Sequence, residues 1–136
     1  MKKALIFLSL AVSVVACKQS QEPKNETADM YEASELSQTM RDMVEYSKLV
    51  REQIRNDEQV SPVPKHIWNL KKAEGTRDEH LEDAFQALAD PYLEALKGLE
   101  TGDSNAYYYS KSIAACKACH SSYCGGPLQV INQLGL

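Results

Sequence analysis

The sequence offers little that would build a β-sheet, cross a membrane or bind nucleic acid. No segment alternates apolar and polar residues for long enough to predict a strand. The longest apolar run, residues 4–15, is too short to span a bilayer as a helix. Acidic residues outnumber basic ones by 19 to 15, so nucleic acid is not an expected partner. We therefore expect an acidic, all-α protein.

One motif in the sequence indicates a cofactor. Cys116-Lys117-Ala118-Cys119-His120 is a C-x-x-C-H pentapeptide, which is typical of c-type haem attachment. Two thiols three residues apart on a helix lie on nearly the same face, so both can form thioethers to the two vinyl groups of one porphyrin. His120 can then supply an axial nitrogen to the iron. The motif predicts one covalent haem c, bound by Cys116 and Cys119 and ligated by His120.

Two other interpretations of the motif are open. A C-x-x-C pair can be a thioredoxin-like dithiol, but such a pair normally opens a helix after a strand, and no strand pattern precedes Cys116. Cys116, Cys119, His120 and Cys124 could form a Cys3His zinc site, although the ligands of such sites usually come from two separated segments. Haem attachment is the interpretation that the spacing favours.

The N-terminus predicts export. Met1-Lys2-Lys3 is a short basic region, an apolar run follows it, and small or apolar residues precede Cys17. This pattern resembles a bacterial lipoprotein signal, which implies cleavage after residue 16, a lipid on Cys17 and anchoring to a bacterial membrane; an ordinary signal peptide is the alternative. Covalent haem attachment in bacteria takes place after export, outside the cytoplasmic membrane, so this expectation agrees with the motif. The haem domain is expected in the periplasm or at the cell surface.

The expected domain organisation follows from these features. Residues 1–16 are the signal peptide, residues 17–29 form a flexible tether without large apolar side chains, and residues 30–136 form one haem-binding domain. Without Lys2 and Lys3 the formal charge falls from −4 to about −6. An acidic surface suits a basic docking patch on a redox partner, and it equally suits solubility. With Cys17, Cys116 and Cys119 assigned, Cys124 is left over; we expect it to be buried, with an exposed thiol as the alternative.

Apolar residues at steps of three and four predict four helices. The first begins near Leu36 and ends before the segment 56–64. A shorter one covers 65–73. Thr76 and Glu79 resemble a capping box that opens the third, which Pro91 kinks or splits. Asp103 or Ser104 caps the fourth, and Gly125-Gly126-Pro127 ends it. The expected inward stripes are Leu36, Met40, Met43, Val50 and Ile54; Leu81, Phe85, Leu88, Tyr92, Leu96 and Leu99; and Ala106, Tyr109, Ile113, Cys116, His120 and Tyr123.

Four helices with short connections predict an antiparallel four-helix bundle that carries haem on its C-terminal helix. Met40 and Met43 lie one turn apart on the inward face of the first helix, and a thioether is a good sixth ligand to haem iron. We predict Met40 as that ligand, with Met43 as the alternative and core filling as the plainer role of both. His66 and His80 are weaker candidates for the same position.

A C-x-x-C-H motif on the last helix of a small exported four-helix protein resembles the class II cytochromes c, meaning cytochrome c prime and its low-spin, methionine-ligated relatives. The segments 37–43 (SQTMRDM) and 116–127 (CKACHSSYCGGP) also look like small c-type cytochromes of Bacteroidetes-type bacteria. The resemblance implies haem c with His120 as axial ligand, and it allows a homodimer. In cytochrome c prime the iron is five-coordinate and open to nitric oxide or carbon monoxide.

The expected function is single-electron transfer by a membrane-tethered monohaem cytochrome with His/Met ligation. The alternative is a five-coordinate protein that binds NO or CO. An enzyme such as a peroxidase is not expected, because the sequence offers no distal His/Arg pair or acid–base group for oxygen–oxygen cleavage.

Overall fold

The computed structural model describes residues 32–78 and 82–136, and this part of the chain is all-helical. Its elements are α1 (Glu35–Arg55), the 3-10 helix η1 (Lys65–Lys72), α2 (Asp83–Thr101), α3 (Asn105–Tyr123) and the short α4 (Leu128–Asn132). No strand occurs in these two ranges, and none of their helices is long and apolar enough to cross a membrane. The predicted all-α class is confirmed.

Helix α1 begins and ends where the sequence predicts. The Ser34 hydroxyl caps it by accepting a hydrogen bond from the Ser37 amide at 3.3 Å. Ser47, which interrupts the apolar stripe, is nevertheless buried. Its hydroxyl donates to the Met43 carbonyl at 2.8 Å, so burial leaves no polar group of this side chain without a partner.

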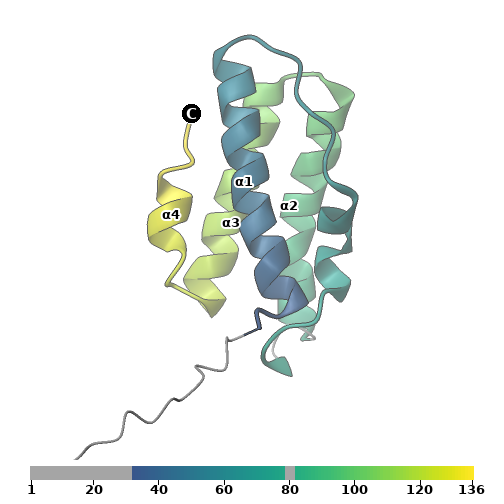
Figure 1. The fold of residues 1–136 in the computed structure, drawn as a ribbon, viewed down its shortest axis with the longest axis vertical. Coiled ribbons are helices and arrows are strands. Elements are labelled where there is room, and N and C mark those ends of the chain that lie inside the picture. The colour runs from purple at the N-terminus through teal and green to yellow at the C-terminus, as the bar shows by residue number, and fades with distance from the viewer. Residues whose placement is uncertain (1–31, 79–81) are drawn as a thin grey trace, which may run out of the picture. The chain divides into compact units, whose positions relative to one another are not determined.

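The chain returns along α1 as an extended strap, residues 56–64, that leads into η1 (Figure 1). Gln53 bonds both the amide and the hydroxyl of Ser61, at 3.0 and 2.8 Å, and the Leu36 amide donates to the Glu74 carbonyl at 2.9 Å. These contacts at opposite ends of α1 show that the strap and η1 run antiparallel to it.

The predicted second helix is present, but it is a 3-10 helix instead of an α-helix. Its buried residues Ile67, Leu70 and Ala73 recur every three residues. This is the period of a 3-10 helix, in which side chains at i and i+3 lie over one another. The strap and η1 therefore cover α1 and α2 with a narrow row of apolar side chains.

Helix α2 differs from its prediction at two points. It begins at Asp83 instead of near Thr76, and Glu82 makes no side-chain cap. The predicted helix start at Thr76 is therefore wrong, and the Thr76 hydroxyl donates to the Ser34 hydroxyl oxygen at 3.2 Å. Glu79, the other member of the predicted capping box, and Leu81 lie outside the described residues. The helix also continues through Pro91 to Thr101 without a split. Pro91 is exposed, so its ring faces solvent.

Helix α3 runs antiparallel to α2. Phe85 near the start of α2 contacts Tyr123 at the end of α3, edge to face with ring centroids 6.2 Å apart. Ser104 takes the N-cap position of α3 in the left-handed conformation, without a side-chain cap. Tyr109 and Ile113 are buried as predicted. Ala106 is exposed, against prediction, because its face of the first turn meets no neighbouring element.

Gly98 of α2 packs closely against the Tyr108 ring of α3. A Cβ atom at this position would overlap the ring of Tyr108. At an exposed position inside a helix, a Gly→Ala substitution raises the free energy of unfolding by about 0.5–1 kcal/mol. We expect Gly98→Ala to lower the free energy of unfolding by about 1–3 kcal/mol, because the ring must shift. Urea unfolding measures this, with Ala87→Gly on the exposed face of α2 as the propensity control. A more stable Gly98→Ala variant would contradict the close packing.

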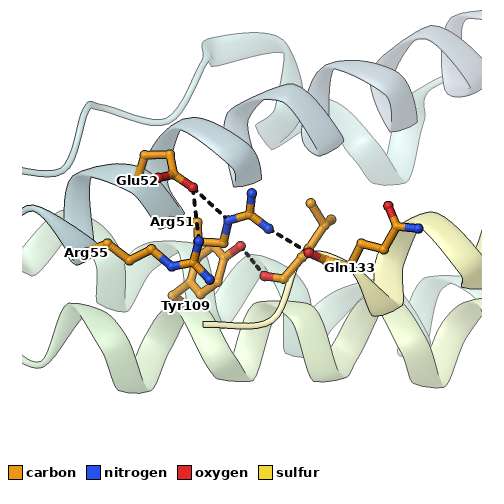
Figure 2. Close-up of polar contacts among 6 residues, drawn as sticks. Arg51, Glu52, Arg55, Tyr109 and Gln133 are labelled. Atoms are coloured by element: carbon orange, nitrogen blue, oxygen red, sulfur yellow. Dashed lines mark hydrogen bonds and ion pairs between the residues drawn. The ribbon is translucent and has the colours of Figure 1, made fainter.

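Helix α4 is absent from the sequence prediction, and it returns the chain end along α3. Figure 2 shows how this end is held: the Tyr109 hydroxyl donates to the Leu134 carbonyl, and Arg51 donates to the Gln133 carbonyl, both at 2.6 Å. Glu52 in turn pairs with Arg51 and Arg55 at 3.1 and 3.3 Å. The motif-bearing α3 is thus the last long helix, and a short one follows it.

Candidate functional site

The C-x-x-C-H motif lies in the last two turns of α3. Cys116 is half-buried and packs against the apolar core, while Cys119 and His120 are half-buried one turn further on. In Figure 1 this end of α3 lies at the same end of the fold as the start of α1. The residues that the sequence predicts as haem-binding are therefore close together, partly shielded and on one stretch of helix.

The turn after α3 orients His120. Its Nδ1 atom lies 3.1 Å from the Cys124 carbonyl oxygen. A carbonyl oxygen can only accept a hydrogen bond, so this contact holds the proton on Nδ1 and leaves the lone pair on Nε2. A hydrogen bond to a backbone carbonyl is the usual way in which a metal-ligating histidine is fixed in orientation.

Both motif cysteines are free thiols in a poorly solvated place. Burial, with a smaller contribution from Cys119, raises the pKa of Cys116 to about 12. Burial also raises the pKa of Cys119. A redox-active dithiol needs the opposite, a pKa lowered by a helix N-terminus or a nearby cation. The position at the end of α3 and the raised pKa values do not support the dithiol interpretation.

The thiols should therefore differ in reactivity in the haem-free protein. At pH 8 the thiolate fraction of Cys116 is about a thousandfold below that of an ordinary thiol with a pKa of 9.0. We expect iodoacetamide to label exposed Cys124 first and Cys116 last, as read by peptide mass spectrometry. A Cys17→Ser background and a urea-unfolded sample are the controls. Equal labelling of Cys116 and Cys124 would contradict the burial of Cys116.

The same shift has a consequence for stability. The unfolded thiol loses its proton near pH 9, whereas folded Cys116 keeps it until about pH 12. The contribution of Cys116 to stability is therefore complete below pH 9 and is lost as the pH rises from 9 to 12.

The zinc interpretation finds no support in the side-chain arrangement. Across residues 32–78 and 82–136, no three His, Cys, Asp or Glu side chains are grouped so as to hold a metal ion. Cys124 is exposed, so the expectation that it is buried is wrong. Cys124 is the C-cap residue of α3, and the two glycines that follow it are exposed as well. A haem iron needs no set of three metal-ligating side chains, since the porphyrin supplies four nitrogens and the chain supplies only an axial ligand.

The two candidate methionines differ in burial. Met43 is 6% exposed and belongs to the core, whereas Met40 is half-buried and packs against the same core as Cys116. Both contribute to the core face of α1, as predicted, and Met40 is the less buried of the two. His66 is exposed and lies 3.1 Å from Asp42, so it is a surface group.

Several predicted features lie outside the described residues. These are the signal peptide 1–16, the tether 17–29 with Cys17, and the weaker ligand candidate His80. Their assignments remain predictions.

Buried aromatic residues of α1 and α3 contribute to the apolar core against which Cys116 packs. Of the Tyr107–Tyr109 run, Tyr109 is buried, Tyr108 packs at the core edge and Tyr107 is 55% exposed. Tyr46 of α1 is also buried. Tyr46 lies three residues after Met43 and four before Val50, and this helical spacing in the sequence predicts that it faces the core.

The comparisons with known proteins add no family. The chain matches no protein-family model, no curated protein and no solved structure. The chemistry of the site therefore depends on the residues themselves. Two reduced thiols three residues apart on one helix, with an adjacent histidine held through Nδ1, are a donor set that fits covalent haem.

Proposed function

We propose that this chain is a membrane-tethered monohaem c-type cytochrome that carries single electrons. Cys116 and Cys119 would form the two thioethers, and His120 Nε2 would be the proximal ligand. The observation that carries the proposal is the 3.1 Å contact between His120 Nδ1 and the Cys124 carbonyl, which leaves Nε2 free on the residue that the motif assigns to iron.

A bound haem supplies a one-electron Fe(III)/Fe(II) couple. The chain's own residues orient and shield it. The Cys124 carbonyl fixes the His120 ring, and the half-buried thiols would hold the macrocycle edge against the core. Met40 would offer its sulfur as the sixth ligand, which favours the reduced state and a higher potential. Such a site binds and releases an electron without substrate chemistry, which is why we propose no enzymatic activity.

The arrangement of the chain supports a variant of the four-helix bundle. Helices α1, α2 and α3 form three of its members, and the strap with η1 runs along α1 in the place of the second. We propose that this is a class II type bundle in which the second helix has been reduced to a 3-10 turn. The haem-bearing helix would be α3, with α4 as an added C-terminal arm.

The remaining parts of the proposal follow from the sequence. Cys17 would carry the lipid, placing the domain outside the cytoplasmic membrane. The formal charge of −4 for the whole chain suits a redox partner with a basic docking patch.

A redox titration tests the proposed function. The haem-loaded protein should show one reversible one-electron transition, low-spin iron in the oxidised form and no spectral change on adding carbon monoxide to the reduced form. High-spin iron that binds carbon monoxide or nitric oxide would overturn electron transfer through a His/Met haem and favour the five-coordinate alternative.

A further inference from the structure

Three buried tyrosines from three helices belong to the apolar core against which Cys116 packs. Tyr46 comes from α1, Tyr92 from α2 and Tyr109 from α3, with 6%, 3% and 1% of their surfaces exposed. The phenol groups and the thiol therefore share one poorly solvated region.

Two of the three hydroxyl groups have acceptors. The Tyr46 hydroxyl donates to the Ser61 carbonyl at 3.0 Å, and the Tyr109 hydroxyl donates to the Leu134 carbonyl at 2.6 Å. The Tyr92 hydroxyl is buried without a hydrogen-bond partner among the described residues. A buried hydroxyl without a partner is destabilising, and phenylalanine would fill the same space without that penalty. Its presence in the core against which Cys116 packs therefore needs an explanation.

Burial, Cys116 and the other two tyrosines all raise the pKa of Tyr92 well above its ordinary value. The phenol is therefore protonated at every physiological pH, and it is available as a donor. A donor of this kind stabilises any acceptor that enters its surroundings, and it does so most strongly when that acceptor gains negative charge.

We infer that Tyr92 is a positioning residue whose hydroxyl donates a hydrogen bond to the haem group held at Cys116. This inference rests on the proposed function. The acceptor is either the thioether sulfur of Cys116 or a propionate oxygen, which share the property of accepting a hydrogen bond. Because reduction adds an electron to the haem, the bond favours the reduced form and raises the potential.

The test compares Tyr92→Phe with Tyr109→Phe in two forms of the full chain, made with and without the haem-attachment machinery. In the haem-free form we expect Tyr92→Phe to unfold in urea at or above the wild-type midpoint, while Tyr109→Phe unfolds below it, because only Tyr109 loses a bond. In the haem-loaded form we expect Tyr92→Phe to lower the equilibrium constant for reduction by about two- to tenfold. Tyr46→Phe, which also removes a satisfied bond, is a second control.

The pH dependence identifies the acceptor. A propionate acceptor makes the Tyr92→Phe shift in potential vary with pH, since the lost bond also raises the propionate pKa; a thioether acceptor gives the same shift at every pH.

Two results would overturn the inference. A haem-free Tyr92→Phe variant as destabilised as Tyr109→Phe would show that the hydroxyl already has a partner. An unchanged potential in the haem-loaded variant would show that it does not reach the haem. If wild-type protein attaches no haem, the proposed function fails and this inference with it; if haem is attached and the potential does not move, the inference alone fails.

Discussion

The double variant Cys116→Ser, Cys119→Ser is expected to contain no covalently bound haem after export with the haem-attachment machinery. Serine hydroxyls do not add to the vinyl groups, so neither thioether can form. Intact-mass spectrometry and haem staining of a denaturing gel measure the loss. Each single variant should keep one thioether at most, and its haem should be easier to extract.

Cys124→Ser is the matched control for this prediction. Its thiol is exposed and lies outside the C-x-x-C spacing, so the variant should retain full haem content. Equal haem loss in Cys124→Ser and in the double variant would contradict the assignment of the two thioethers to Cys116 and Cys119.

Replacing Met40 by alanine is expected to convert low-spin iron to high-spin iron and to open the sixth position to carbon monoxide. The reason is the loss of the only sixth ligand that we propose, a soft thioether on the inward face of α1. Absorption and electron paramagnetic resonance spectra of the oxidised protein report the change. The midpoint potential should fall with it, because methionine favours the reduced form.

Met43 provides the control, because it lies one turn away and is almost completely buried. Met43→Ala should lower the free energy of unfolding by about 2–5 kcal/mol through the cavity that it leaves, and the iron should stay low-spin. Met43→Leu should keep both stability and spin state. A spin change in Met43→Leu with none in Met40→Ala would exchange the roles of the two methionines.

The amphipathic part of the fold could be predicted from the sequence. The three- and four-residue steps from Leu36 to Ile54 fix the inward face of α1, and they fix the helix to within one residue at its N-terminus. The stripe Phe85, Tyr92, Leu96 and Leu99 is buried as expected in α2. These faces are predictable because apolar periodicity directly reflects burial against a neighbouring element.

The parts that escaped prediction depend on contacts between distant residues. The α-helix predicted to open at Thr76 begins only at Asp83, and the Thr76 hydroxyl bonds Ser34, 42 positions away. Helix α4 is only five residues long, and Arg51 and Tyr109 anchor the two residues that follow Asn132. The period of three in η1 is visible in the sequence, but a short apolar row with that spacing also fits an α-helix.

Within the site, the spacing of the C-x-x-C-H motif singles out Cys116, Cys119 and His120, and their role in binding haem stays a prediction. The Cys124 carbonyl that orients His120 could not be predicted, because its position depends on the backbone turn after α3. The lack of a hydrogen-bond partner for the Tyr92 hydroxyl could not be predicted either. The apolar periodicity of α2 predicts that the ring is buried, but it does not predict the hydrogen bonds of the hydroxyl group.

Covalent haem attachment is tested most directly by a pyridine haemochrome spectrum of the purified protein after acid–acetone extraction of any non-covalent haem. We expect a c-type spectrum that stays with the polypeptide at one haem per chain. A spectrum without haem, or a b-type haem that the solvent removes, would contradict covalent attachment at Cys116 and Cys119 and with it the proposed function.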